Sequence, residues 1–289
     1  MTIGPGGITL ASLNVCCGMS HPLRPVRERA AEFCRRLEAA DVDIVNFQEV
    51  WAPGLTRFLR AHLPSFPFAA ARRGLLGGPA GGLLSVSRSP LRSAVYSSFR
   101  GIRPPAGGVV SRVAPLAGTL PQGVLTFEVA GARTVVGNVH LTANRDGDWT
   151  PGNRHEAFQL QQLARVHAAM RRARRPDTEL SLLAGDFNLP SGSPRYPAVV
   201  DGGAWHDPFA EADLPTFHAE LLPPGASAHR IDYLLVRADP DRHPVVRAHR
   251  LLTGPVHMPS GETAFLSDHV AQVVRVGPPR PGTRRGTAE

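Results

Sequence analysis

Acidic, amide and imidazole side chains follow several apolar runs of the sequence. The run from Leu180 to Ala184 is followed by Asp186 and Asn188, which face the same way on an extended chain because they are two residues apart. Burying an unpaired carboxylate is costly, so such groups pair, bind metal or line a polar cleft. The same arrangement recurs at Asn14, Glu49, His140, Asp232, Asp268 and His269. If these strand ends converge, they form a cleft with four carboxylates, two amides and two imidazoles.

This set of side chains suits metal-assisted phosphoryl chemistry. Clustered carboxylates repel one another unless a cation joins them. Oxygen ligands suit Mg²⁺ or Mn²⁺, whereas zinc prefers cysteine and histidine. A hard divalent cation polarises a phosphoryl oxygen, and a His–Asp pair deprotonates or orients water. Each element alone has a plainer interpretation, because "GDFN" is also typical of a strand ending in an Asx-turn, and His140 of an ordinary hydrogen-bonded histidine.

The apolar runs that carry these residues are typical of β-strands in length and β-branched content. Strands are predicted at 7–15, 42–50, 81–89, 123–130, 133–143, 179–188, 230–238 and 269–277. Helical spacing of apolar residues predicts two helices, at 24–41 and 155–174. The short separation of 123–130 from 133–143 indicates an antiparallel pair. Strands thus outnumber helices, which predicts a layered α/β domain with mixed or antiparallel sheets and helices packed outside.

Glycine and proline concentrate in three segments that we expect to be loops, at 74–82, 101–108 and 221–230. No linker divides the chain in two, so a single catalytic domain is predicted over residues 8–276. The tail at 277–289 is rich in proline, glycine and arginine, and we expect it to be disordered.

The composition of the sequence indicates the cellular compartment and limits the kinds of partner that we expect. The chain has 289 residues and is 42% hydrophobic, and no apolar run approaches the roughly 20 residues of a membrane span. The N-terminus lacks the pattern of a signal peptide, and three cysteines do not make a disulfide framework, so we expect a cytoplasmic protein without a stable membrane anchor, and a monomer. The net charge of +8 would suit a nucleic-acid partner, but all 32 basic residues are arginine, which favours codon bias from a GC-rich genome as the explanation. The densest cluster, at 171–177, is interpreted as a solvated helix end.

The ordered series "LNV", "FQEV", "GNVHL", "GDFN", "RIDYLL" and "SDH" closely resembles the endonuclease/exonuclease/phosphatase superfamily, the DNase I-like phosphoesterases. The resemblance extends from Asn14 to His269, and its specificity lies in the order and combination of six motifs. It implies a four-layer α/β/β/α sandwich of two mixed, largely antiparallel sheets flanked by helices. This agrees with the coarse interpretation of the strands and helices.

The resemblance also implies a role for each residue that matches a motif. Glu49 is then the principal Mg²⁺ or Mn²⁺ ligand, with Asn14 beside it, and Asp268 lies near the metal. Asp186 orients the attacking water, Asn188 contacts the phosphoryl group and His140 binds the phosphate, while Asp232 pairs with His269, the general base or a phosphate-stabilising imidazole. The number of metals and the identity of the base stay open. Cys16 and Cys17 stand where a bulky aromatic residue is expected, and are interpreted as small buried side chains.

The segments 140–163, 48–51 and 81–91 resemble the neutral-sphingomyelinase-like branch of this superfamily. This favours hydrolysis of a phosphodiester or phosphomonoester of a small molecule or lipid headgroup, with Asn144 and Arg154 predicted to bind substrate. A secreted sphingomyelinase is not expected, since aromatic content is 6% and the segment 253–265 has neither tryptophan nor tyrosine.

Three alternatives remain for the function. The arginine excess favours an Mg²⁺-dependent DNA or RNA nuclease, but no interleaved aromatic and basic segment is present to stack bases. A phosphoinositide phosphatase is disfavoured because Leu189 and Pro190 follow "GDFN", where an arginine is expected. A non-catalytic binding module is the most remote alternative, because all the expected catalytic residue types are present.

Overall fold

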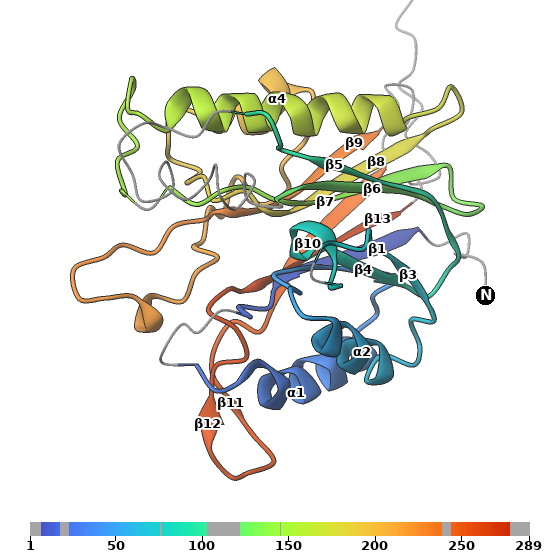
Figure 1. Ribbon diagram of the computed structural model, residues 1–289, viewed down its shortest axis with the longest axis vertical. Helices are drawn as coiled ribbons and strands as arrows, with labels where there is room; N and C mark the ends of the chain where they lie inside the picture. Colours follow the sequence, from blue (N-terminus) through green and yellow to red (C-terminus); the bar gives the residue numbers. More distant parts are fainter. Residues whose placement is uncertain are drawn as a thin grey trace, which may run out of the picture.

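Two mixed β-sheets lie face to face in the fold, and helices cover their outer faces (Figure 1). The computed structural model describes residues 7–17, 23–75, 77–102, 122–144, 146–238 and 244–277. The first sheet has six strands in the order β10-β13-β1-β2-β4-β3. Their bounds are β1 Ile8–Asn14, β2 Ile44–Gln48, β3 Phe68–Ala70, β4 Leu84–Ser87, β10 Val245–Leu251 and β13 Ala271–Gly277.

The second sheet has five strands in the order β5-β6-β7-β8-β9. Their bounds are β5 Leu91–Ser98, β6 Gly123–Val129, β7 Thr134–His140, β8 Leu180–Asp186 and β9 Asp232–Ala238. The helices are α1 Val26–Ala39, α2 Pro53–Ala61, α4 Glu156–Ala173 and α5 Tyr196–Val199, with 3₁₀ turns η1 Ala80–Gly82, η2 Asp201–Gly203 and η3 Ala219–Leu221. A short hairpin of β11 (Val256–His257) and β12 (Thr263–Ala264) projects from the first sheet's side of the molecule (Figure 1). The predicted four-layer sandwich is therefore confirmed.

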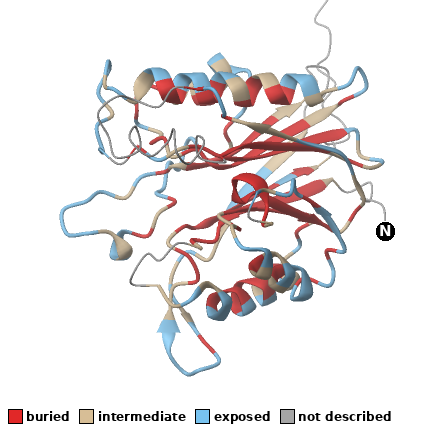
Figure 2. Ribbon diagram, viewed as in Figure 1, coloured by how far each residue is buried: buried red, intermediate tan, exposed pale blue. Residues whose placement is uncertain are grey.

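Three hydrophobic clusters hold the layers together, and burial follows the faces that pack (Figure 2). In α1, the fully buried Phe33 and Leu37 pack on the first sheet together with residues of α2. In α4, Leu163 and Val166 pack on the second sheet. Both helices were predicted from this spacing, since residues three or four apart share one helix face. The third cluster lies between the sheets.

A buried polar network also joins the two sheets. Asn138 of β7 donates through Nδ2 to the carbonyl oxygens of Phe47 and Leu84, at 3.1 and 3.3 Å, and its Oδ1 accepts from Nε2 of Gln48 at 2.8 Å. Asn46 of β2 donates back across the interface to Gly137 O at 3.1 Å. Because buried amides are costly when unpaired, this network favours one relative register of the two sheets.

Each sheet contains one parallel pair, and these pairs decide where the strand ends meet. β1 runs parallel to β2, and β7 runs parallel to β8, whereas the other strand pairs are antiparallel. The carboxyl ends of parallel neighbours lie at the same edge of a sheet. Asn14 therefore ends beside Gln48 in the first sheet, and His140 ends beside Asp186 in the second.

Buried Arg29 connects α1 to two segments at this edge. Its guanidinium donates to the carbonyl oxygens of Val15, Cys16 and Leu266, at 3.1, 2.7 and 2.5 Å. These acceptors come just after β1 and just before β13. The sequence analysis placed Arg29 in a helix but gave it no role. The structure shows that it ties together the segments that carry Asn14 and the "SDH" motif.

Gly185 fixes the end of β8 one residue before Asp186. Its φ is +147°, and a Cβ added there would lie 1.9 Å from the carbonyl oxygen of Val139 on β7. We expect Gly185→Ala to lower the free energy of unfolding by about 3 kcal/mol, because backbone cannot move aside as a flexible side chain does. Urea unfolding of both proteins measures this loss.

Gly254→Ala is the matched control, since a Cβ at Gly254 would meet nothing within 4 Å. We expect this variant to stay within about 0.5 kcal/mol of the wild type. Equal stability of the two variants would contradict the tight β7–β8 approach.

The eight predicted strands and both predicted long helices are present, with ends shifted by a few residues. The sequence analysis missed α2, β5 and β10, as well as the short β3 and the hairpin. Residues 278–289 of the predicted tail and 103–108 of one predicted loop lie outside the described residues. Within the described part of the chain, none of the helices has the length and apolar character to cross a membrane.

Candidate active site

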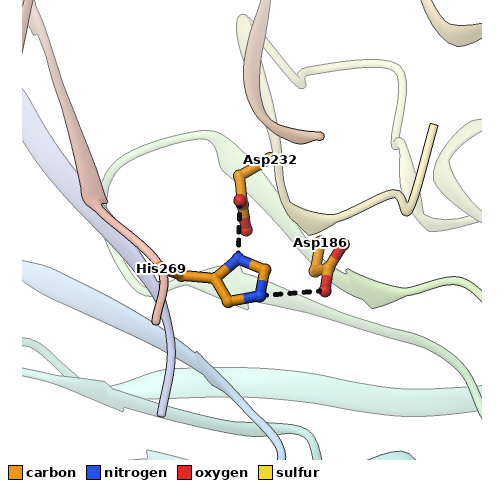
Figure 3. Close-up of side chains that lie close together, drawn as sticks. All are labelled: Asp186, Asp232 and His269. Atoms are coloured by element: carbon orange, nitrogen blue, oxygen red, sulfur yellow. Dashed lines mark hydrogen bonds and ion pairs between the residues drawn. The ribbon is translucent and has the colours of Figure 1, made fainter. Parts of the chain in front are cut away.

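An imidazole lies between two carboxylates where the strand ends converge (Figure 3). Nδ1 of His269 is 2.8 Å from Oδ2 of Asp232, and its Nε2 is 3.8 Å from Oδ2 of Asp186. All three side chains are buried. The pairing of Asp232 with His269 that the resemblance implies is thus present in the structure.

Strand register brings these residues together. His140 pairs with Asp186 between β7 and β8, and Asp186 pairs with Asp232 between β8 and β9, so three site residues are neighbours across three strands. His269 comes from the first sheet, just before β13. Its backbone N–H donates to Oγ of Ser267, which itself donates to Asn14 O at 2.6 Å and so ties the segment before β13 to the end of β1 within the first sheet.

The charges around His269 favour its protonated form. Burial alone lowers the pKa of His269, but the carboxylates of Asp232, Asp268 and Asp186 outweigh burial, so this pKa lies well above its ordinary value. Burial and the neighbouring Asp232 raise the pKa of Asp186 to about 7. Asp186 and His269, 3.8 Å apart, can therefore both carry a proton in acid–base chemistry.

His140 has the opposite character. Burial, with His269 nearby, lowers the pKa of His140 to about 3, so its imidazole is neutral. Its Nε2 lies 3.7 Å from Oδ2 of Asp186, and its buried Nδ1 has no hydrogen-bond partner in the described part of the chain. The indole of Trp51 lies against it, with ring centroids 6.1 Å apart. A neutral imidazole beside Asp186 can donate one hydrogen bond to a bound oxygen.

Asn14 lies between two carboxylates. Its Nδ2 donates to Oε1 of Glu49 at 3.3 Å and to Oδ2 of Asp186 at 3.0 Å. Its Oδ1 accepts from the backbone N–H of Cys16 at 3.0 Å, which fixes the orientation of the amide. In this arrangement the side-chain nitrogen of Asn14 orients the carboxylates of Glu49 and Asp186, and its side-chain oxygen is bonded to the backbone. That Asn14 lies beside a metal ion stays a prediction.

The donors at this edge fit a hard divalent cation. Glu49 and Asp268 are half-buried carboxylates beside buried Asp186, and burial of clustered negative charge is relieved by a cation. Ligand atoms of Asp186, Asp232 and His269 also lie within 4.8 Å of one another. There, however, His269 already bonds Asp232, so we interpret this trio as a proton-transfer chain and keep Glu49 as the predicted metal ligand.

A family model matches the part of the chain that carries the motifs. A model described as "Endonuclease/Exonuclease/phosphatase family" matches residues 11–269 of the chain. The chain belongs to the endonuclease/exonuclease/phosphatase family. The matched span contains every predicted site residue, from Asn14 to His269, and the predicted resemblance is confirmed. No curated protein sequence matches the chain significantly.

Solved structures with the same fold cover nearly the whole chain at low sequence identity. Sphingomyelinase C from Streptomyces griseocarneus has a TM-score of 0.67 at 19% identity, over 93% of this chain and 99% of that one. A mutant beta toxin from Staphylococcus aureus with bound magnesium ions has a TM-score of 0.68 at 16% identity, over 93% and 99%. Humanized TDP2 from D. rerio has a TM-score of 0.64 at 18% identity, over 93% and 98%. At these identities the likeness shows the fold, and it leaves the substrate open.

Some of the backbone strain in the described part of the chain lies around the site. Three non-glycine residues just beyond strand ends have positive φ: Cys16 at 48°, Glu49 at 64° and Asn188 at 49°. Such conformations cost about 1 kcal/mol or more each and persist where the surroundings enforce them. Cys16 is buried, as predicted, whereas Cys17 is only half-buried.

Asn188 lies at the exit of the site. Its N–H donates to Oδ1 of Asp186 at 2.8 Å, and its Nδ2 donates to Leu141 O at 2.9 Å, so its position is fixed from both sides. It lines a cavity together with Asn144. Arg154 instead forms an ion pair with Asp146 within the loop that follows β7. Substrate binding by Asn144 and Arg154 stays a prediction.

Two aromatic residues near the site were missed by the sequence analysis. Phe217 packs edge-on against His269, with ring centroids 5.1 Å apart and the planes at 70°. Trp149 lines the same cavity as Asn188 and Asn144. Both come from loops with no periodic pattern, so only the tertiary structure reveals them.

Proposed function

We propose that the protein is a Mg²⁺- or Mn²⁺-dependent phosphoesterase that hydrolyses a phosphodiester or phosphomonoester of a small molecule or lipid headgroup. Members of the endonuclease/exonuclease/phosphatase family are usually hydrolases of phosphoester bonds. The observation that carries the proposal is the chain of Asp186, His269 and Asp232, placed beside Asn14 and Glu49. This arrangement places residues that can transfer a proton next to a carboxylate that can bind a cation, where the strand ends converge.

Each side chain has a role that its position supports. Glu49, with Asp268 nearby, would hold the cation, which when bound polarises a phosphoryl oxygen. Asp186 and His269 exchange the proton of the attacking water, and Asp232 holds the Nδ1 side of the imidazole. Neutral His140 and the fixed amide of Asn188 offer hydrogen bonds to phosphoryl oxygens.

The projecting hairpin favours a substrate that is reached without membrane insertion. The connection between β11 and β12 reads Met-Pro-Ser-Gly-Glu, and Met258 is buried. Among the described residues, the large apolar side chains that are exposed lie elsewhere: Phe68, Leu75, Val95, Leu160 and Leu214. An interfacial enzyme presents apolar residues to the bilayer, and the described part of this hairpin does not.

The arginine cluster does not favour the nuclease alternative. α4 is 18 residues long, so Arg174 at its C-terminal end lies about 27 Å along the axis from the start of the helix near the site. Arg171 pairs with Asp201 and Arg175 pairs with Glu128. Glu128 lies opposite Val135, five residues from His140 along β7, which is roughly 17 Å. These cations therefore lie at the far end of the sheet and are partly neutralised.

We expect chelation with EDTA to reduce hydrolysis of bis-p-nitrophenyl phosphate by about 10²-fold or more, because the cation stabilises the transition-state charge. Adding Mg²⁺ or Mn²⁺ in excess should restore the rate, while Ca²⁺, which prefers more ligands, should restore it less. Release of p-nitrophenolate measures the rate. An unchanged rate in EDTA would contradict a metal-dependent enzyme, and absence of hydrolysis under all metal conditions, on this ester, nucleic acids and phospholipids, would contradict a phosphoesterase.

A further inference from the structure

A cavity of about 560 Å³ opens beside Asn188. Its described lining comes from the loop after β7, the loop after β8 and the segment that precedes β9. The residues are Asn144, Gly147, Trp149, Asn188, Pro190, Phe217, Leu222, Ala226, Ser227, His229 and Ile231. We call it the Trp149 cavity. Its volume is within the range of pockets that hold small molecules.

The Trp149 cavity is continuous with the proton-transfer chain. Asn188, in its wall, donates to Asp186 at 2.8 Å, and Phe217, also in its wall, packs edge-on against His269. Ile231 is the residue before Asp232. A group that fills the cavity is thus close enough to be covalently attached to a phosphate held at the site.

The residues that line the Trp149 cavity favour some substituents of the phosphate over others. The described lining has the aromatic rings of Trp149 and Phe217, the imidazole of His229, aliphatic residues and short polar side chains, but it has neither a carboxylate nor a guanidinium. A polyanion would meet one imidazole and no guanidinium there, and an ammonium group would meet aromatic rings but no carboxylate to neutralise its charge. An uncharged aromatic group, in contrast, is matched by Trp149 and Phe217, because aromatic rings stack or pack edge to face.

We propose that the Trp149 cavity binds an uncharged aromatic substituent of the phosphodiester, and that Trp149 determines this specificity. The inference rests on the proposed phosphoesterase function and names the substrate class of that site. Phe217 contributes the second aromatic surface of the cavity, next to His269.

Trp149 is held in place by its own loop, without a ligand. Buried Arg195 donates to the carbonyl oxygens of Trp149 and Thr150 at 3.3 and 3.4 Å. Asn144 donates to Asp148 O at 2.8 Å, which closes the loop on the other side. A ring whose backbone is fixed on both sides loses little conformational freedom when substrate binds, which favours affinity.

Four S-ethyl phosphorothiolate diesters test the proposal, because they share the non-aromatic leaving group ethanethiol, whose release a thiol reagent measures, and differ only in the second substituent. These are the phenyl, methyl, choline and thymidine 5′ esters. We expect kcat/KM for the phenyl ester to exceed that for the methyl and choline esters by about tenfold or more, the effect of one well-packed aromatic group. A methyl or choline ester that matched or exceeded the phenyl ester would overturn the proposal.

Trp149→Ala should lower kcat/KM for the phenyl ester about tenfold and leave the methyl ester unchanged, whereas Trp149→Phe should retain most of the phenyl preference. Leu214→Ala removes an exposed apolar side chain outside the cavity and should change neither ester. Equal losses on both esters would show a structural role for Trp149 and would contradict the proposed specificity.

The experiment separates failure of this inference from failure of the proposed function. Metal-dependent hydrolysis of the methyl ester without a phenyl preference would retain the phosphoesterase and reject the aromatic subsite. No hydrolysis of any of the four esters, with folding confirmed by circular dichroism, would reject both.

Discussion

Glu49→Gln is expected to reduce kcat/KM by about 10³-fold, with no loss of thermal stability. Glutamine keeps the shape of the side chain and an oxygen that can accept from Nδ2 of Asn14, which Glu49 now does at 3.3 Å. It removes the negative charge that a divalent cation needs, and the cation carries several kcal/mol of transition-state stabilisation. Steady-state kinetics over a Mg²⁺ series should show both a lower maximal rate and a higher half-saturating Mg²⁺ concentration.

Glu128→Gln is the matched control for this substitution. Glu128 pairs with Arg175 on the surface at the far end of the second sheet, so its loss should leave kcat and the Mg²⁺ dependence unchanged. If Glu49→Gln kept near-wild-type kinetics and the same Mg²⁺ response, Glu49 would not be the metal ligand and the assignment would move to Asp186 or Asp268.

The strands that carry the site were predictable because they are buried in the middle of their sheets. β1, β2, β7 and β8 are buried along nearly their whole length, and such strands read as continuous apolar runs. The residue where each apolar run gives way to a polar one is then also the residue that reaches the sheet edge. That is why Asn14 and Asp186 could be named from the sequence.

Two edge strands, β5 and β10, were missed for the complementary reason, whereas the edge strand β9, which is buried over most of its length, was predicted. β5 and β10 each lie at one end of a sheet, and most of their residues are half-buried or exposed, so the apolar signal is interrupted by arginine, serine and histidine. α2 is only nine residues long, which is too short for a clear helical period. Its start at Pro53 follows the preference of proline for the first helical turn.

The supporting parts of the site depend on contacts between residues far apart in sequence. Nothing local in "RPVRERAAEF" distinguishes buried Arg29, which bonds Leu266 O, from the exposed arginines around it. Asn138 lies inside a strand that also reads as apolar, and its amide function is explained only by Phe47 and Leu84 on the opposite sheet. Such pairings depend on how distant segments pack, so the sequence predicts the motif residues but not the residues, such as Arg29 and Asn138, that hold the motifs in place.

Asp186→Asn is expected to reduce kcat by about 10³-fold while leaving the protein at least as stable as the wild type. Asp186 is the point where the site residues meet, since Asn14, Asn188, His140 and His269 all lie within hydrogen-bond or ion-pair distance of its carboxylate. An amide cannot take the proton of the attacking water, and loss of a residue that acts as part of a unit costs orders of magnitude in kcat. Pre-steady-state and steady-state hydrolysis measure the loss.

The stability of this variant is the more discriminating measurement. In the wild type, two buried carboxylates share one imidazole, and burial and the Asp232 charge both raise the pKa of Asp186. Removing one of the two charges relieves this repulsion, so the Tm should stay the same or rise, as expected where a site is built for activity at the expense of stability. Asp43→Asn, at the opposite end of the first sheet where Asp43 accepts from the N–H of Thr9, should leave kcat unchanged. A fall in Tm with kcat retained would mean that Asp186 is a structural anchor and that the proton-transfer chain does not pass through it.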